Sequence, residues 1–280
     1  MYPKEARYSK EALCPKKARY LKEALYPKEV RYPKEALYPE GTKYPKEALI
    51  PGKKNGKPRR HGGNGVKMEN IIVVEDLVKS YRGIKVLDHV DISFEKGKIH
   101  GITGRNGSGK TVLIKTICGL VQPEKGRVWV NGKEIGRDVD FPENTGVIIE
   151  APGFLPSLSA YKNLDYLASL RNVIGKEQIR DAIYAVGLEP DDKKHVGKYS
   201  LGMKQRLGIA QAIMEDPEIL ILDEPMNALD KSGTAEIREL LLHLKERGKT
   251  ILLVSHNPED IRMLCDTVQE MDGGRLLSAL

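Results

Sequence analysis

The stretch from Gly104 to Thr111 constrains the fold of this chain more than any other. It fits the pattern G-x-x-x-x-G-K-[ST] and consists of Gly104, Arg105, Asn106, Gly107, Ser108, Gly109, Lys110 and Thr111. Glycines let the backbone curl so that successive N–H groups point inward and form a concave anion site. Residues 98–103 predict a short buried strand before the loop, and Thr111 to about Leu120 predicts an apolar helix after it. The positive end of that helix faces the same place, so the stretch predicts a phosphate site in an α/β fold.

The last residues of this loop predict how a nucleotide is held. We expect Lys110 to reach the β- and γ-phosphates and the Thr111 hydroxyl to bind Mg²⁺. The alternative is a chance glycine-rich turn, against which stand the preceding strand, the following helix and the Lys-Thr pair. The predicted ligands are therefore ATP and Mg²⁺.

Two later strands predict the catalytic side chains. Residues 219–222 form an all-apolar run that ends in Asp223 and Glu224, and residues 250–254 form another run that leads to His256. Strands that release polar groups at their carboxyl ends build nucleotide sites in α/β folds. We expect Asp223 to hold Mg²⁺ and Glu224 to act as the general base that polarises the attacking water.

Further candidates stand outside these runs. Tyr81 is placed where its ring could stack on an adenine face, although a structural tyrosine is an equal alternative. Ser200 is a natural N-cap, and Gly202 leaves the backbone accessible, so this helix start predicts a second anion site or an ordinary capped helix. Residues 126–132 predict a strand that closes on an Asn-Gly turn, with Trp129 in the core.

In this order, the motifs resemble the nucleotide-binding domain of ABC transporters from about Glu69 to the C-terminus. Tyr81 matches the adenine-stacking aromatic, 104–111 Walker A, and 199–203 the signature motif. Asp223 and Glu224 match Walker B with its catalytic base, 227–230 the D-loop, and His256 the switch histidine. The resemblance adds Val112 and Asp230 to the ATP-binding residues, together with Ser200 and Gly202, and His256 to the catalytic ones.

The resemblance also implies an architecture and partners. The expected fold is an α/β P-loop NTPase, with a RecA-like core sheet flanked by helices, an antiparallel β subdomain and a helical subdomain at about 151–206. Two subunits, as a homodimer or a heterodimer, would sandwich two ATP, each site joining Walker A of one chain to the signature of the other. A membrane-spanning permease chain would contact the helical subdomain, and no nucleic-acid partner is expected.

Three departures from the family pattern stand out. Glu150 occupies the Q-loop position, where glutamine is usual; a carboxylate can still ligate Mg²⁺ but adds negative charge near the γ-phosphate. The signature has Leu201 and Met203 where glycine and glutamine are usual, while Val112 replaces a hydroxyl residue. The residues around Glu150, Asn163 and Ser200 are similar to those of bacterial exporters of the bacitracin and lantibiotic type.

Residues 1–67 differ in composition from the rest of the 280-residue chain. They carry 18 Lys and Arg against 7 Asp and Glu, a net charge of +11, whereas the remainder carries 28 against 32, a net charge of −4. A unit close to Tyr-Pro-Lys-Glu-Ala-Leu repeats every six residues, with tyrosines at Tyr2, Tyr8, Tyr20, Tyr26, Tyr32, Tyr38 and Tyr44.

Proline in nearly every unit disfavours both a helix and a β-helix, so we expect an extended or disordered arm. The alternatives are a basic arm for nucleic acid or anionic lipid, weakened by the glutamate in nearly every unit, and a segment with no working role. We expect the ATPase domain to occupy residues 68–280, with Met68 as a natural start.

Composition limits the compartment. No apolar run approaches the about 20 residues that a membrane helix needs, and no secretory signal is evident. Cys14, Cys118 and Cys265 are far apart, which indicates neither a disulfide framework nor a zinc site. The resemblance to ABC transporters implies a peripheral protein at the cytoplasmic face of the cell membrane, an ATPase that drives export. A soluble ABC ATPase and a regulatory module that binds ATP without turnover remain the alternatives.

Overall fold

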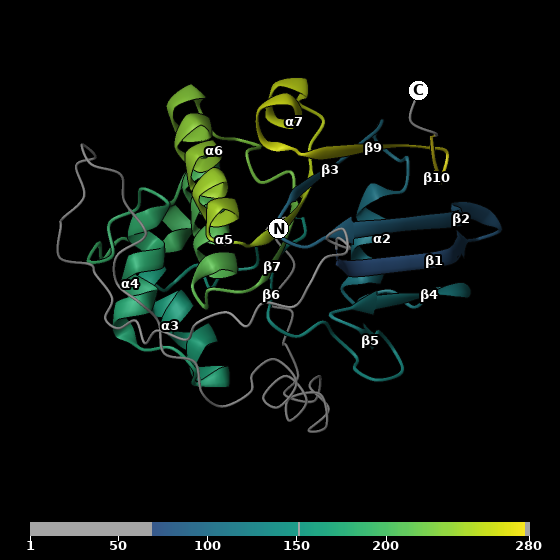
Figure 1. Cartoon of the computed structure of the whole chain (residues 1–280). Helices are drawn as coiled ribbons and strands as arrows, with labels where there is room; N and C mark the ends of the chain where they lie inside the picture. The colour runs from purple at the N-terminus through teal and green to yellow at the C-terminus, as the bar shows by residue number, and fades with distance from the viewer. Residues whose placement is uncertain (1–68, 151, 278–280) are drawn as a thin grey trace, which may run out of the picture.

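A largely parallel sheet forms the centre of the molecule (Figure 1). The computed structural model describes residues 69–150 and 152–277, so the predictions for the arm at 1–67 lie outside the described residues. The six-stranded sheet has the order β10-β9-β3-β8-β7-β6. Its strands are β3 (Ile99–Thr103), β6 (Thr145–Ile148), β7 (Ile219–Asp223), β8 (Thr250–Val254), β9 (Thr267–Asp272) and β10 (Arg275–Leu276). Only β10 pairs antiparallel, with β9.

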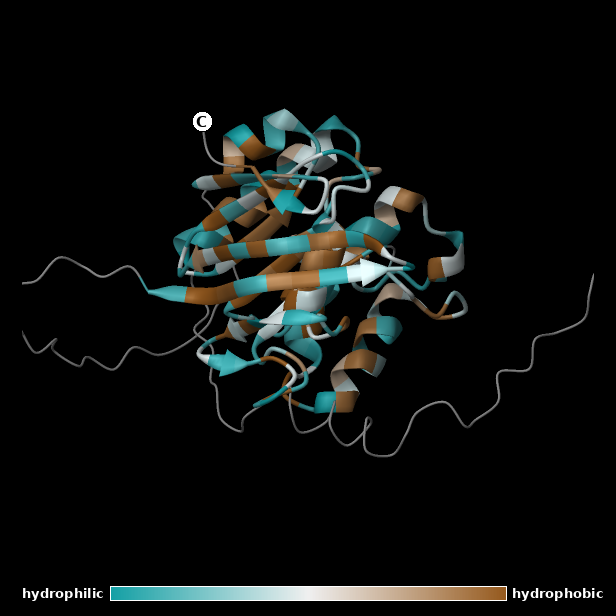
Figure 2. Ribbon diagram, turned by 90° about the vertical axis from the view of Figure 1, so that its right-hand side faces the viewer, coloured by the Kyte–Doolittle hydropathy of each residue, from teal (hydrophilic) through white to brown (hydrophobic). Residues whose placement is uncertain are grey.

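The central strands are buried on both faces, as their continuous apolar sequence predicts. Leu220 and Leu222 of β7 pack into one hydrophobic cluster, while Ile219 and Ile221 pack into a second cluster on the opposite face. Residues of β8 divide between the same two clusters in the same alternating way. Figure 2 shows these hydrophobic strands in the middle of the molecule. The sheet is therefore a rigid layer whose carboxyl edge can hold side chains in fixed positions.

An antiparallel sheet lies to one side, in the order β2-β1-β4-β5. Its strands are β1 (Asn70–Tyr81), β2 (Ile84–Glu95), β4 (Lys125–Val130) and β5 (Lys133–Glu134). The predicted Asn-Gly turn is present, because Asn131 and Gly132 both have positive φ, at 50° and 72°. The prediction that Trp129 lies in the core is wrong. Its ring is half-buried and carries the Arg127 guanidinium 4.9 Å from its centroid, so it covers the outside of the sheet.

Helices cover both faces of the parallel sheet. They are α2 (Lys110–Ile117), α3 (Ala160–Arg171), α4 (Lys176–Ala185), α5 (Leu201–Ile213), α6 (Lys231–Glu246) and α7 (Pro258–Leu264), with a 3₁₀ turn η1 (Val196–Lys198). In Figure 1, α3 and α4 lie on the opposite side of the molecule from the antiparallel sheet. Within the helical subdomain expected at about 151–206, α3 and α4 are separate helices, because Asn172 ends α3 with φ of 56° and Gly175 caps α4.

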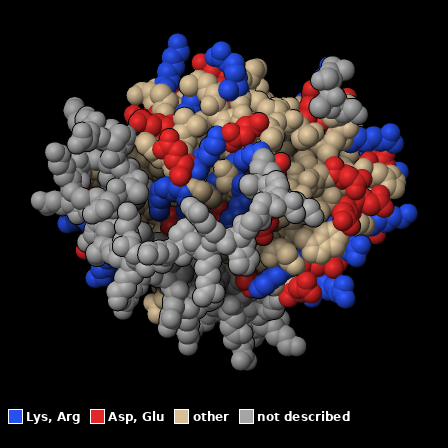
Figure 3. All heavy atoms as spheres, viewed as in Figure 1, with Lys and Arg blue, Asp and Glu red and all other residues tan. Residues whose placement is uncertain are grey.

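Acidic and basic side chains are interspersed on the described surface that Figure 3 shows. Within residues 69–150 and 152–277, no helix combines the length and apolar character needed to cross a membrane.

Candidate functional site

Four loops of interest leave the parallel sheet at its carboxyl edge. The glycine-rich loop follows β3, Glu150 follows β6, Asp223 ends β7 with Glu224 directly after it, and His256 follows β8. Because the parallel strands are adjacent and in register, their carboxyl ends meet at one edge. The sheet thus brings together residues that lie more than 100 positions apart in sequence.

The glycine-rich loop has the curled backbone that its sequence predicts. Gly104, Gly107 and Gly109 have φ of 137°, 80° and 107°, a region that other residues rarely adopt. A Cβ at Gly104 would lie 2.2 Å from the Met271 carbonyl oxygen, so a side chain is excluded there. Lys110 is buried, and its Nζ donates to the carbonyl oxygens of Gly104 at 2.7 Å and Arg105 at 2.9 Å. The ammonium group is therefore held across the loop, where phosphate oxygens would be stronger acceptors.

Thr111 and Asp223 meet beside this loop. The Thr111 hydroxyl donates to Asp223 Oδ2 at 2.9 Å, which links the first turn of α2 to the end of β7. Burial raises the pKa of Asp223, and the Thr111 hydrogen bond opposes that rise. A hydroxyl and a carboxylate side by side are the oxygen ligands that Mg²⁺ prefers, so the residues present fit that ion.

Glu224 and His256 form the second pair of the site. The Nδ1 of His256 lies 2.8 Å from Glu224 Oε1. Glu224 has φ of 50°, and its carbonyl oxygen accepts from the Gln205 amide at 3.2 Å. The left-handed backbone after β7 separates Glu224 from Asp223, so two neighbouring carboxylates take different partners. A carboxylate fixed by an imidazole is poised to accept a proton.

Glu150 differs from the other predicted metal ligands. Its Oε1 pairs with Lys115 Nζ at 2.6 Å, and its side chain is 64% exposed. Within the described residues, no hydrogen bond joins Glu150 to Thr111 or Asp223, although its charge contributes to raising the pKa of Asp223. Glu150 also has φ of 61°. It therefore lies close enough to influence the site while its carboxylate is engaged with α2.

The remaining predicted residues occupy other elements. Tyr81 ends β1 with its ring 46% exposed and Lys79 Nζ 5.4 Å from the ring centroid. The predicted N-cap at Ser200 is confirmed, because its hydroxyl accepts from Met203 N at 3.2 Å. A Cβ at Gly202 would lie 2.8 Å from the Ala228 carbonyl oxygen, so the signature glycine packs against the loop after β7. Asp230 caps α6, accepting from Gly233 N at 2.8 Å.

The predicted ATP-binding residues include two candidate anion sites, the glycine-rich loop and the start of α5. Among the hydrogen bonds and ion pairs of residues 69–150 and 152–277, none joins the stretch from Gly104 to Val112 with Ser200 or Gly202. Val112 itself packs against the hydrophobic cluster that contains Ile219 and Ile221, and its carbonyl accepts from the Thr116 hydroxyl at 2.8 Å. The glycine-rich loop and the signature helix start are thus two anion-binding candidates of one chain.

The sequence predictions missed three contributors. Gln205 links α5 to the Glu224 backbone, Lys115 engages Glu150, and the turn at Gly273 and Gly274 packs against the glycine-rich loop. For the turn, the Gly-Gly pair that follows a strand is a signal in the sequence, because both residues have positive φ. The partners of Gln205 and Lys115 have no such local signal.

Comparisons with known proteins agree with this geometry. The family profile described as ABC transporter matches residues 87–227. An uncharacterised ABC transporter ATP-binding protein of Bacillus subtilis (strain 168) is 46% identical over 206 residues, which cover 74% of this chain and 94% of that protein. The bacitracin transport ATP-binding protein BcrA of Enterococcus faecalis is 42% identical, covering 75% of this chain and 69% of that protein.

A third relative extends the comparison, and solved structures support the fold. The lantibiotic transport ATP-binding protein SrtF of Streptococcus pyogenes is 36% identical, covering 74% of this chain and 89% of that protein. The structure of a dimeric ATP-binding cassette bound to ADP and Pi superposes with a TM-score of 0.67 at 22% identity, covering 73% of this chain and 96% of that one. At that identity the likeness confirms the predicted fold class alone.

Proposed function

This chain belongs to the ABC transporter family of ATP-binding proteins, and from that premise we propose that it hydrolyses MgATP to power export through a separate membrane-spanning partner. The observation that carries the proposal is the meeting of Thr111 with Asp223, and of Glu224 with His256, at the edge where the glycine-rich loop begins. One loop can hold the triphosphate, and the adjacent strand end supplies both a metal ligand and a proton acceptor.

Triphosphate binding would use the loop and its lysine. The backbone N–H groups from Gly104 to Gly109 surround the anion, and Lys110 transfers its hydrogen bonds from loop carbonyls to the β- and γ-phosphates. The hydroxyl of Ser108 supports this role, because it is buried and has no partner among the described residues. Thr111 and Asp223 would hold Mg²⁺, which would neutralise phosphate charge. The exposed ring of Tyr81 would stack on the adenine.

Hydrolysis would use Glu224 as the general base. Its carboxylate accepts a proton from the attacking water, while His256 orients the carboxylate through the 2.8 Å contact. Asp223, one residue earlier, is directed at Thr111 and serves as metal ligand instead. Glu150, already paired with Lys115, would act as a further metal contact and as a link to the membrane partner.

Each complete site would need two subunits. Among the described residues, Ser200 and Gly202 contact Met203 and Ala228 and make no hydrogen bond to the Gly104–Thr111 loop of the same chain, so the signature of one subunit would contact the γ-phosphate held by the other. The helix start at Ser200 supplies N–H groups and the positive end of α5 for that contact. Asp230, at the start of α6, would line the same interface. The subunit partner is either a second copy or a homologous chain.

The helical region would contact the permease at the cytoplasmic face of the membrane. Leu155, Tyr166 and Leu170 of this region are 47%, 55% and 46% exposed, which offers apolar side chains to a partner. The export direction is proposed from similarity to proteins described as bacitracin and lantibiotic transport ATP-binding proteins. Residues 1–67 would form an arm outside the ATPase domain at 68–280.

Replacing Lys110 by alanine tests the phosphate assignment. Loss of a charge-assisted contact worth about 1.5–3 kcal/mol should weaken ATP binding about 10- to 150-fold, and Mg²⁺-dependent phosphate release should fall with it. Equilibrium binding of ATP and phosphate release are the measurements. Lys133→Ala is the matched control, since Lys133 is exposed and pairs with Glu143 in the antiparallel sheet. Unchanged ATP affinity in Lys110→Ala would refute the assignment.

A further inference from the structure

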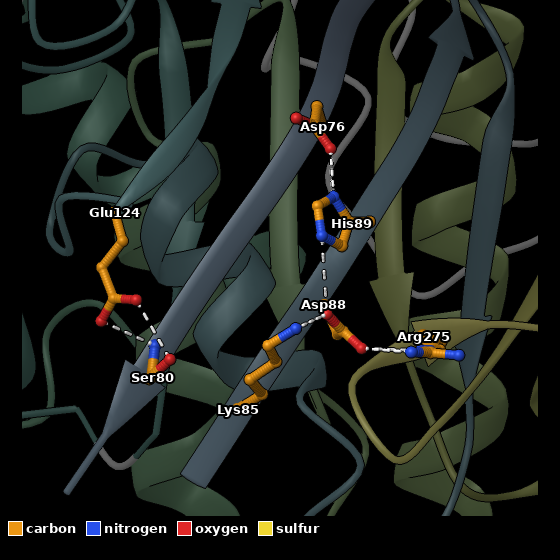
Figure 4. Close-up of polar contacts among 7 residues, drawn as sticks. All are labelled: Asp76, Ser80, Lys85, Asp88, His89, Glu124 and Arg275. Atoms are coloured by element: carbon orange, nitrogen blue, oxygen red, sulfur yellow. Dashed lines mark hydrogen bonds and ion pairs between the residues drawn. The ribbon is translucent and has the colours of Figure 1, made fainter. Parts of the chain in front are cut away.

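A buried carboxylate joins the antiparallel sheet to the C-terminal hairpin (Figure 4). Asp88 of β2 is 7% exposed, and its Oδ2 accepts from Arg275 Nε at 2.8 Å and from Arg275 Nη2 at 2.5 Å. Its other oxygen accepts from Lys85 Nζ at 2.6 Å. Hydrogen bonds from Lys85 and Arg275 lower the pKa of Asp88 to about 2, so the carboxylate stays charged at neutral pH. Arg275 belongs to β10, so the pair links residues 187 positions apart.

A β-bulge gives Asp88 its direction. In the β1–β2 register Leu77 pairs with Val90 and Lys79 pairs with Leu87, which leaves one extra residue in β2. His89 takes φ of 55° within the bulge, and its Nδ1 lies 2.5 Å from Asp76 Oδ1 on β1. The bulge interrupts the alternation of buried and exposed residues along β2, because Leu87 and Val90, which lie three positions apart, are both fully buried. Bulges re-aim side chains near functional sites, and this one leaves Asp88 beside β10.

The same hairpin packs against the glycine-rich loop. Gly274 N donates to the Ser108 carbonyl at 3.0 Å, and Gly274 O accepts from Asp88 N at 2.9 Å. A Cβ at Gly274 would lie 2.7 Å from the Val86 carbonyl oxygen, so β2 and the hairpin turn are in direct contact. The Met271 carbonyl lies against Gly104, as described above. The end of β9 and the turn before β10, from Met271 to Gly274, therefore lie between β2 and the phosphate loop.

The antiparallel sheet carries Tyr81 at the end of β1. The end of β1 is also fixed by Glu124, whose carboxylate accepts hydrogen bonds from Ser80 N and Ser80 Oγ, each at 3.0 Å. Tyr81 and the phosphate loop thus belong to two sheets, and the spacing between them depends on the contacts that join those sheets. The Asp88–Arg275 pair is the charged contact on the side of the hairpin.

We propose that Asp88 and Arg275 are positioning residues that hold the antiparallel sheet, and with it Tyr81, at a fixed distance from the phosphate loop, and so contribute to recognition of the adenine base. This inference rests on the proposed binding of ATP with its adenine against Tyr81. The alternative role is a stabilising ion pair without influence on the nucleotide. The two roles differ in whether the loss of ligand affinity in an Arg275 variant depends on the presence of the adenine.

Binding of ADP and of inorganic pyrophosphate to full-length Arg275→Ala distinguishes them. Both ligands use the phosphate loop, only ADP carries adenine, and neither is hydrolysed by the ATPase reaction. We expect ADP affinity to fall about 2- to 10-fold, the worth of an aromatic stacking contact, with pyrophosphate affinity unchanged. The KM for ATP should rise by a similar factor with kcat unchanged. Arg275→Lys should restore part of the ADP affinity, because lysine can still donate to Asp88 but not through two nitrogens.

Arg127→Ala is the matched control. Arg127 also lies on the antiparallel sheet, and its contact with Glu75, at 3.6 Å, stays within that sheet. Arg127→Ala should leave the affinities for ADP and for pyrophosphate unchanged. Unchanged ADP affinity in Arg275→Ala, or equal losses for ADP and pyrophosphate, would overturn the inference. If the unmodified protein bound pyrophosphate as tightly as ADP, the adenine role of Tyr81 would fall together with this inference, while the Lys110→Ala experiment would still decide the phosphate site.

Discussion

The adjacent carboxylates Asp223 and Glu224 contact different partners because the backbone turns between them. Asp223 is the last residue of β7 and accepts from Thr111, whereas Glu224 adopts a left-handed conformation and contacts His256. Glu150 is a third carboxylate near the same loop, but it is bound to Lys115 and largely exposed. The local partners therefore favour Glu224 as the base and Asp223 as the metal ligand.

The two glutamates can be separated by matched amide substitutions. Glu224→Gln keeps size and hydrogen bonding but removes the proton acceptor, so single-turnover hydrolysis should fall about 10²- to 10⁴-fold while ATP binding persists. The dimer should also remain longer in its closed state. Glu150→Gln places the family's usual residue at that position and should keep substantial hydrolysis. A near-normal rate for Glu224→Gln, with collapse for Glu150→Gln, would reverse the assignment.

At the scale of elements, the contact between α3 and α5 joins the helical region to the core. Arg171 near the end of α3 pairs with Glu215 just beyond α5 at 2.5 Å, and their side chains are only 11% and 13% exposed. Helix α5 also packs directly on β6, since a Cβ at Gly146 would lie 2.0 Å from the Ala212 carbonyl oxygen. These contacts connect α5, which Ser200 caps, with β6, the strand that leads to Glu150.

Breaking this ion pair should destabilise the protein strongly. Arg171→Met removes the guanidinium group that faces the largely buried Glu215 carboxylate, and removing one member of a buried ion pair typically costs about 3–5 kcal/mol in the free energy of unfolding. The double variant Arg171→Met with Glu215→Leu should recover much of that loss, because the buried carboxylate is then also absent. Arg180→Met is the control: its pair with Asp191 is exposed and should contribute at most about 1 kcal/mol. Denaturant unfolding curves provide the values, and equal losses for both arginines would contradict the argument.

At the scale of the whole molecule, no hydrogen bond or ion pair of the described residues joins the phosphate loop to the signature residues Ser200 and Gly202, which favours a shared site. A dimer that exchanges subunits allows this to be tested with two inactive variants. Lys110→Ala damages the phosphate loop. Ser200→Asp damages the signature by adding negative charge, and it retains an N-cap residue for α5.

Mixing these two variants should restore part of the ATPase activity. In a mixed dimer, one composite site carries both substitutions and the other carries neither. Phosphate release from the mixture should therefore exceed that of either parent alone, with labelled subunits confirming exchange. A mixture as inactive as its parents, despite demonstrated exchange, would show that the sites are not completed in trans or that both must be intact.

Removal of the repeat tests the proposed domain boundary. A chain that begins at Met68 should unfold at the same temperature and hydrolyse ATP at the same rate as the full chain, because the repeat supplies no periodic apolar face that could pack on the ATPase domain. Thermal unfolding and steady-state hydrolysis of the two chains are the measurements. Failure of the shorter chain to fold would establish the arm as structural.

By itself, the sequence determined the features that depend on short-range chemistry. Glycine spacing around Lys110, apolar runs that end at Asp223 and His256, and a hydroxyl before α5 are local patterns, and each has a local geometric consequence. The predicted P-loop fold and the family are confirmed for this reason. The break between α3 and α4 also has a local cause in Asn172 and Gly175, although the expectation of a helical subdomain at about 151–206 did not include it.

Only the tertiary structure decided which distant side chains meet. The pairing of Glu150 with Lys115, the hydrogen bond from Gln205 to the Glu224 backbone, and the half-buried position of Trp129 depend on how separate elements pack. The contact of Asp88 with Arg275 joins residues 187 positions apart, and it forms only because a bulge in β2 and the β9–β10 hairpin near the C-terminus lie side by side. Side-chain patterns encode which face of an element is apolar, but partner choice depends on the packing of whole sheets and helices, which local patterns do not specify.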